Sequence, residues 1–402
     1  MPAPSSSLPR RAATAAVPPV PWYNNRRIRG VLYQILVLGS VIGIVAYLVG
    51  NTLDNLERRS IATGFGFLGR EAGFGISEAV VPYSPADTYL HALFVGLLNT
   101  LKVSFIGIVL ATILGTIAGI ARLSRNWLVA KFASFYVESL RNVPVLLQLF
   151  FWYALITEAL PVPREALNPL PGVFLSARGM HFPEPVWGPT HGAMAVALAF
   201  GIVAAIIVAR WARRRRERTG QPFATTTVAL ALVVGLPVAA FLAGGAPTAL
   251  EVPVLRGFNF QGGTSISPEF AALLIGLVLY TGTFIAEIVR GGILAVSHGQ
   301  TEAGLALGLK RAQVMRLIIL PQALRVIIPP LTSQYLNLTK NSSLAVAIGY
   351  PDLVSVANTA INQTGQAVEG VAIIMAVYLT ISLSIAAFMN WYNQRIALKG
   401  GR

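Results

Sequence analysis

Eight stretches of the chain are apolar for about the length that a membrane-spanning helix needs. The hydrocarbon core of a bilayer is about 30 Å thick, which a helix crosses with about 20 residues. Polar and charged residues separate the stretches, so each is predicted to be a separate span. They cover residues 31–50, 90–120, 143–160, 193–209, 226–243, 270–289, 326–348 and 371–390.

The composition agrees with a protein that faces lipid. Of the 402 residues, 54% are hydrophobic and 12% are charged, whereas soluble proteins carry about 25% charged residues. So few charges cannot cover a globular surface of this size. The absence of cysteine excludes disulfides, zinc–thiolate sites, iron–sulfur clusters and cysteine nucleophiles.

The net charge of +15 is concentrated in alternate loops, with a run at Arg213–Arg216 between the fourth and fifth stretches. Positive residues collect in cytoplasmic loops, so we predict eight spans with both termini in the cytoplasm. A basic run can also bind nucleic acid. Its position between two apolar stretches favours contact with the lipid bilayer instead, and we expect no nucleic-acid partner.

The first 21 residues are rich in Pro, Ala and Ser and lack the apolar core of a secretory signal. They predict a disordered cytoplasmic tail. The long outer loops 51–88 and 161–190 could fold onto the outer face. The inner loop between the sixth and seventh stretches mixes apolar and basic residues and predicts short amphipathic helices. Gly308 suits the end of one helix, and Pro321 suits the first turn of the next.

No common catalytic motif is present in the sequence. Only five lysines occur and none follows a glycine, so there is no phosphate-binding Gly-Lys-Ser/Thr. The four histidines are scattered, and neither His-Glu-x-x-His nor Gly-x-Ser-x-Gly occurs. We therefore expect no enzyme activity, no catalytic residue, no metal and no cofactor in this chain. A conduit that another protein drives is the better hypothesis.

The inner loop carries the most specific motif in the chain. Glu302-Ala303-Gly304, Gly308, Ile318 and Leu320-Pro321 resemble the EAA loop of ATP-binding-cassette (ABC) importer permeases, with Gly304 where the pattern has alanine. Four further strings resemble the polar amino acid permease family: residues 99–104, 136–144, 287–293 and 320–325, followed by Lys340-Asn341-Ser342-Ser343-Leu344.

The resemblance implies an all-α membrane protein of about eight transmembrane helices. Five form the core of a type I importer permease. An extra first helix and an inserted helix pair are similar to the larger permease subunit of general L-amino acid importers. The implied parts are a tail (1–29), the extra helix and outer loop (30–88), the first half of the core (89–160), the insertion (161–265), the second half (266–395) and a C-terminal tail (396–402).

The resemblance also implies the partners and the coupling residues. A cytoplasmic ATPase dimer binds the ATP, a second permease subunit completes the channel, and a periplasmic amino-acid-binding protein delivers the amino acid substrate. The EAA loop then contacts the ATPase as a coupling helix, although the same residues would also suit an ordinary helix pair at the membrane surface. The coupling residues are Glu302, Ala303, Gly304, Gly308, Leu309 and Lys310.

Two Glu-x-x-Arg pairs, Glu138/Arg141 and Glu287/Arg290, lie near the predicted inner ends of spans. Residues three apart face each other on a helix, so we expect intrahelical ion pairs at the membrane boundary. Contact with substrate is the alternative.

The seventh stretch combines Pro329-Pro330 with polar residues. Two prolines should kink or break the helix, and a lysine within a span is a functional candidate. The predicted substrate pathway comprises Asn337, Lys340, Asn341, Ser342 and Ser343, with a helix restarting at Ser342 or Ser343 towards an anion. The alternative is that Lys340 extends to the outer surface or binds the partner subunit.

Two other functions fit the sequence less well. The chain could be a permease of the same superfamily for another small polar solute, which the EAA loop does not exclude. It could also be a secondary transporter that needs no ATPase.

Overall fold

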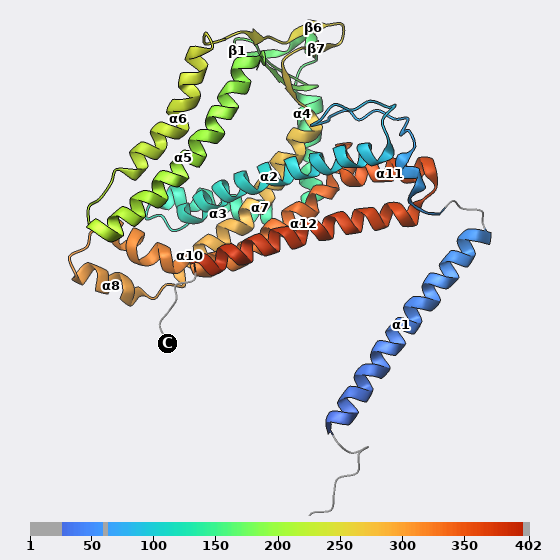
Figure 1. The fold of residues 1–402 in the computed structure, drawn as a ribbon, viewed down its shortest axis with the longest axis horizontal. Coiled ribbons are helices and arrows are strands. Elements are labelled where there is room, and N and C mark those ends of the chain that lie inside the picture. The colour runs from blue at the N-terminus through green and yellow to red at the C-terminus, as the bar shows by residue number, and fades with distance from the viewer. Residues whose placement is uncertain (1–25, 59–62, 397–402) are drawn as a thin grey trace, which may run out of the picture. The chain divides into compact units, whose positions relative to one another are not determined.

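The computed structural model describes residues 26–58 and 63–396, and it is mostly helical (Figure 1). Its α-helices are α1 (Arg26–Arg58), α2 (Tyr89–Ala121), α3 (Trp127–Arg141), α4 (Val145–Ala159), α5 (Pro189–Thr219), α6 (Thr225–Ala243), α7 (Pro268–Leu294), α8 (His298–Ala306), α9 (Arg311–Val314), α10 (Leu320–Asn341), α11 (Leu353–Thr364) and α12 (Ala367–Ile396). Shorter helical turns are η2 (Phe65–Gly69), η3 (Pro163–Glu165), the π-helical η4 (Met315–Ile319) and η5 (Ser342–Ile348).

The helices bear out the predicted number of spans. Among the described residues, seven helical segments are long and apolar enough to cross a membrane, and a bent helix pair makes up to eight. Helix α1 falls into a compact unit separate from the other helices. It begins at Arg26, so the last residues of the predicted tail 1–29 are helical, whereas residues 1–25 and 397–402 lie outside the described residues.

The third predicted span is one arm of the bent pair. Helices α3 and α4 meet at an angle of 104°, and Pro144 stands directly before α4. A proline has no N–H for the preceding turn, so α3 ends at Arg141. The apolar pattern found α4 and missed the more polar arm α3.

Helix α7 lies at the centre of the larger unit and packs against α2, α3, α4 and α10. Glycines bring α2 close to it: a Cβ at Gly115 would stand 2.8 Å from the carbonyl oxygen of Gly282, and one at Gly119 2.6 Å from that of Ala286. Close backbone approach through small residues is typical of membrane helices.

The insertion consists of a helical hairpin and short strands. Helices α5 and α6 have their main helix contacts with each other, through Gly201 against the backbone of Leu232. Strands come before and after the hairpin and were not predicted: β1 (Leu167–Leu170), β2 (Val173–Ser176), β3 (Gly179–Phe182), β4 (Glu184–Pro185), β5 (Leu250–Glu251), β6 (Val254–Arg256), β7 (Asn259–Gln261) and β8 (Thr264–Ile266).

The strands form one four-stranded sheet, β1-β2-β3-β8, and two strand pairs, β4-β5 and β6-β7. Strand β3 pairs with β8, and β4 pairs with β5. These pairs join the segment before α5 to the segment after α6, so the two ends of the hairpin lie side by side. Figure 1 shows the strands near one end of α4, α5 and α6, and α8 near the opposite end of the hairpin.

Of the predicted kink or break at Pro329-Pro330, the break is wrong. Helix α10 continues through both prolines to Asn341. Ile327, Ile328 and Leu331 are buried in the core on either side, so packing holds the helix together. Membrane helices tolerate proline when neighbouring groups satisfy the freed backbone.

Candidate functional site: the coupling segment and the polar residues of the spans

The EAA segment folds as a helix, a turn and a second helix that leads into α10. Helix α8 ends at Ala306, and Gly308 has the left-handed φ of +77° that closes its end, as predicted. Lys310 stands directly before α9, where its N–H donates to the Gln313 side chain at 2.8 Å. Leu309 is half-buried in the turn. Pro321 lies in the first turn of α10.

Gly304 sits where α8 crosses the start of the second helix. It is buried, and a Cβ there would come within 2.8–2.9 Å of the side-chain ends of Ile318 and Val314. These are flexible methyl groups, so alanine would fit after a small shift, while a larger residue would push α8 away. The departure from the motif therefore keeps the close packing of the two helices.

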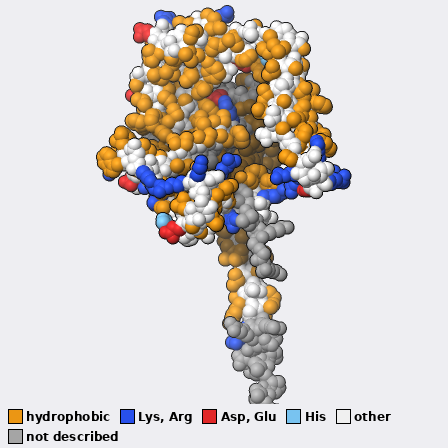
Figure 2. Space-filling view, turned by 90° about the vertical axis from the view of Figure 1, so that its left-hand side faces the viewer, with side chains coloured by type: hydrophobic (Ala, Val, Ile, Leu, Met, Phe, Trp, Pro, Cys, Tyr) orange, Lys and Arg blue, Asp and Glu red, His pale blue; other side chains and the backbone are white. Residues whose placement is uncertain are grey.

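The outer side of α8 is free to meet a partner. Glu302 and Ala303 are exposed, and Glu302 lies 3.1 Å from His298 on the same helix. Leu307 exposes 80% of its surface, and Leu305 is also exposed. Lys and Arg side chains gather in a band along one edge of the larger unit (Figure 2). The segment thus offers an apolar tip beside a basic edge.

The polar residues after the two prolines do not form one cluster. Lys340 and Ser343 line a groove of about 510 Å³ with residues of α11 and α12, among them Tyr378. Ser342 is buried and donates to the carbonyl of Thr339 at 2.7 Å. Asn337 is exposed, and Asn341 is the half-buried last residue of α10.

No α-helix restarts at Ser342 or Ser343, which is a second correction. The chain continues as the 3-10 helix η5 to Ile348, and the next α-helix begins at Leu353. In the first turn of this helix, α11, the N–H of Ser355 already donates to the Asp352 carboxylate at 2.8 Å. That N–H is therefore not available to an anion.

The two Glu-x-x-Arg pairs differ. Glu287 and Arg290 form the expected intrahelical pair at 2.6 Å. The expected pair between Glu138 and Arg141 is wrong: Glu138 pairs at 3.7 Å with Arg122, which also donates to Glu287. Tertiary packing places Arg122 between the two carboxylates.

Arg141 instead lies over the ring of Phe284, 5.5 Å from its centre. The ion pairs therefore join the adjoining ends of α2, α3 and α7. None of the four predicted residues lines the groove that holds Lys340.

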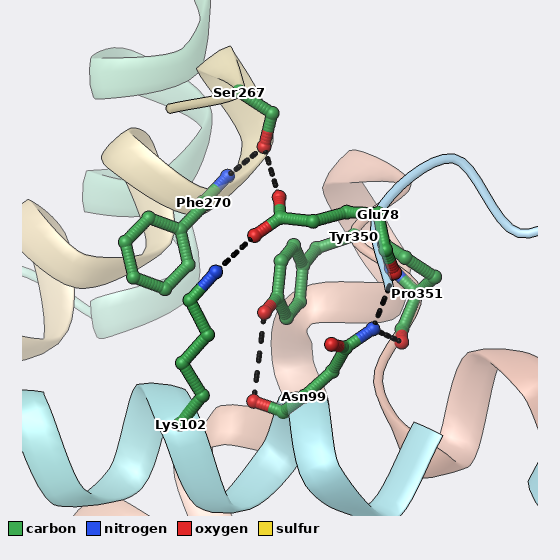
Figure 3. Close-up of polar contacts among 7 residues, drawn as sticks. All are labelled: Glu78, Asn99, Lys102, Ser267, Phe270, Tyr350 and Pro351. Atoms are coloured by element: carbon green, nitrogen blue, oxygen red, sulfur yellow. Dashed lines mark hydrogen bonds and ion pairs between the residues drawn. The ribbon is translucent and has the colours of Figure 1, made fainter. Parts of the chain in front are cut away.

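The structure brings together polar residues to which sequence reasoning gave no role. Lys102 in α2 pairs with Glu78 at 2.6 Å, and Ser267 donates to the same carboxylate at 2.6 Å (Figure 3). Asn99 donates to the carbonyls of Glu78 and Pro351 at 2.7 and 2.9 Å. A lysine in the middle of an apolar stretch was the available signal, but its partner is distant in sequence.

Within the described residues, no group of three His, Asp or Glu side chains could hold a metal ion. Asp352 is fully buried, and burial raises the pKa of its carboxyl from 3.8 to about 7.

Comparison with known proteins supports a transport role. Residues 197–398 match the family model of the binding-protein-dependent transport system inner membrane component. The general L-amino acid transport system permease protein AapQ of Rhizobium johnstonii is 51% identical, over 92% of this chain and 93% of that protein.

The putative amino-acid ABC transporter permease protein YhdX of Escherichia coli is 50% identical, over 94% and 96%. The glutamate/glutamine/aspartate/asparagine transport system permease protein BztB of Rhodobacter capsulatus is 42% identical, over 93% and 95%. The chain therefore belongs to the family of binding-protein-dependent transport system inner membrane components, the permease subunits of ABC importers.

Proposed function

We propose that this chain carries L-amino acids from the periplasm to the cytoplasm as one of two permease subunits. Separate ATPase subunits bind and hydrolyse ATP, and a periplasmic binding protein delivers the substrate. The names of the three relatives, which refer to amino acids or to glutamate, glutamine, aspartate and asparagine, support this substrate class.

The observation that carries the proposal is the coupling segment. Helix α8 presents an exposed apolar tip at Leu307, is closed by Gly308, and is packed through Gly304 onto the helix that continues into α10. A partner that moves α8 would move α10 with it. The basic band of Figure 2 favours a cytoplasmic position for this edge, and both termini are proposed to lie on that side.

The test is uptake of labelled glutamate and glutamine by the reconstituted transporter, comprising this chain, a sister permease, the ATPase and the binding protein. We expect uptake to require ATP. Leu307→Asn should release the ATPase and abolish uptake, because exposed apolar residues anchor interfaces. Leu167→Asn is the matched control, since Leu167 is an exposed leucine of strand β1 and should leave uptake unchanged.

The outcomes separate the alternatives. Stimulated ATP hydrolysis without uptake of any amino acid would indicate a permease for another small polar solute. Uptake by this chain alone, without ATP, would indicate a secondary transporter. Cysteine labelling at position 302 from the outside only would reverse the proposed orientation.

For the substrate pathway we propose Asn337, Lys340, Asn341, Ser342 and Ser343. The groove that holds Lys340 and Ser343 supports this for those two residues. Ser342 would act indirectly, because its hydroxyl is bonded inside the core.

A further inference from the structure

A charged pair lies at membrane depth in α2, outside the groove of Lys340. Lys102 is about 20 Å along the helix from Tyr89, at 1.5 Å per residue. Glu78 reaches it from the segment before α2, and the two side chains are 35% and 16% exposed. Charged groups inside membrane proteins are rare and are found where substrates or ions pass.

The pair is held in one geometry. The Lys102 ammonium lies 4.4 Å from the centre of the Phe270 ring, a contact that attracts cations. The Ser267 hydroxyl donates to the Glu78 carboxylate and accepts from the N–H of Phe270 at 3.1 Å. The first turn of α7 therefore fixes both charges, and Lys102 does not extend freely towards the surface (Figure 3).

Asn99 adds an unused acceptor to the same cluster. Its side chain is fully buried, and its amide nitrogen donates to two carbonyls. Its side-chain oxygen has no partner within the described residues. Figure 3 shows this oxygen on the side of the amide away from those carbonyls. A buried acceptor without a donor is unfavourable, so a ligand that donates there would be favoured.

Building on the proposed amino acid transport, we propose that Glu78, Lys102 and Asn99 bind the zwitterionic end of the substrate. The substrate carboxylate takes the place of Glu78 at the Lys102 ammonium. The substrate ammonium pairs with Glu78 and donates to the Asn99 oxygen. One ion pair is exchanged for two, so no charge is left unpaired in a poorly hydrated place, where it would be costly.

The test compares three variants in the complete reconstituted transporter. Lys102→Met with Glu78→Gln removes both charges and keeps an acceptor for Ser267. Lys102→Glu with Glu78→Lys reverses the pair. Lys131→Met is the matched control for a lysine of α3, outside the cluster.

We expect the neutral and reversed pairs both to lower uptake by at least about tenfold. Both should retain ATP hydrolysis stimulated by the binding protein, and the control should behave as the unmodified chain. Uptake at the level of the unmodified chain with the reversed pair would overturn the proposal. An ion pair that only stabilises the fold can form with its two charges exchanged. Unchanged uptake with the neutral pair would also overturn it.

A second measurement uses the unmodified transporter and does not depend on the variants folding. Acylation of lysines is followed by mass spectrometry with and without saturating glutamine. We expect glutamine to slow acylation of Lys102 and not of Lys131. Equal rates at Lys102 would overturn the proposal. If the unmodified transporter moves no amino acid at all, the proposed function fails, whereas transport with equal acylation rates refutes only this site.

Discussion

At the scale of single residues, burial decides what the polar groups of this permease can do. Lys340 and Ser343 line a groove, while Ser342 is buried in the core. Both serine hydroxyls donate to backbone carbonyls at 2.7 Å. Asp352 is buried at the start of α11 and bonded to the N–H of Ser355. Neighbours in sequence therefore have different surroundings.

Lys340→Met is expected to reduce uptake by the reconstituted transporter by about tenfold or more, because a charge within a span is costly to retain and marks a substrate route. Lys131→Met is the control, since Lys131 lies on α3, outside both the groove and the coupling segment. Unchanged uptake kinetics with Lys340→Met would remove this lysine from the pathway.

The Asp352 carboxyl makes stability depend on pH. Its pKa rises from 3.8 to about 7 in the folded protein because of burial, so the folded state holds the proton more tightly. The stabilisation is complete below about pH 4 and is lost as the pH rises through 7. The shift corresponds to at most about 4 kcal/mol.

Asp352→Asn keeps the oxygen that bonds Ser355 and cannot ionise. We expect its unfolding temperature in detergent to be nearly the same at pH 5 and pH 8, while that of the unmodified chain falls. A parallel fall in both proteins would show that another group controls the pH dependence.

At the scale of the elements, close backbone contact holds the core together. Gly115 and Gly119 let the backbone of α2 approach that of α7 closely. The sequence predicted the helix end at Gly308, since it depends on local backbone geometry. It failed for α10, because burial of its flanking residues outweighs the local effect of two prolines.

Gly115→Ala is expected to destabilise the chain by about 1–3 kcal/mol, the usual cost of overpacking. The added methyl group would meet the Cβ of Ile285 at 2.6 Å and a backbone oxygen of α7, neither of which can move easily. Gly291→Ala is the matched control, because no heavy atom lies within 4 Å of its added Cβ. Thermal unfolding in detergent measures both, and equal unfolding temperatures would contradict the packing argument.

At the scale of the whole molecule, the permease combines a packed helical core with a hairpin whose two ends are joined by paired strands. The strand pairs and a hydrogen bond of 3.2 Å from Thr190 to the carbonyl of Gly244 hold the two ends of the hairpin together. The main helix contacts of α5 and α6 are with each other.

Replacing residues 189–245 by a short glycine linker is therefore expected to leave the core folded and assembled with its ATPase. The strands on both sides still pair, and the contacts of α7 with α2 and α10 are untouched. Co-purification and ATP hydrolysis measure the result, with Gly235→Ala, an α6 substitution with no heavy atom within 4 Å, as the control. Loss of the ATPase would show that the hairpin belongs to the core.

The sequence by itself determined the membrane spans and the end of α8 at Gly308, because apolar run length and capping residues act locally. Tertiary structure alone decided which charges meet. Arg122 lies between Glu138 and Glu287, and Glu78 reaches Lys102. These partners come from separate elements, and a charge takes whichever opposite charge the packing of the helices brings within reach.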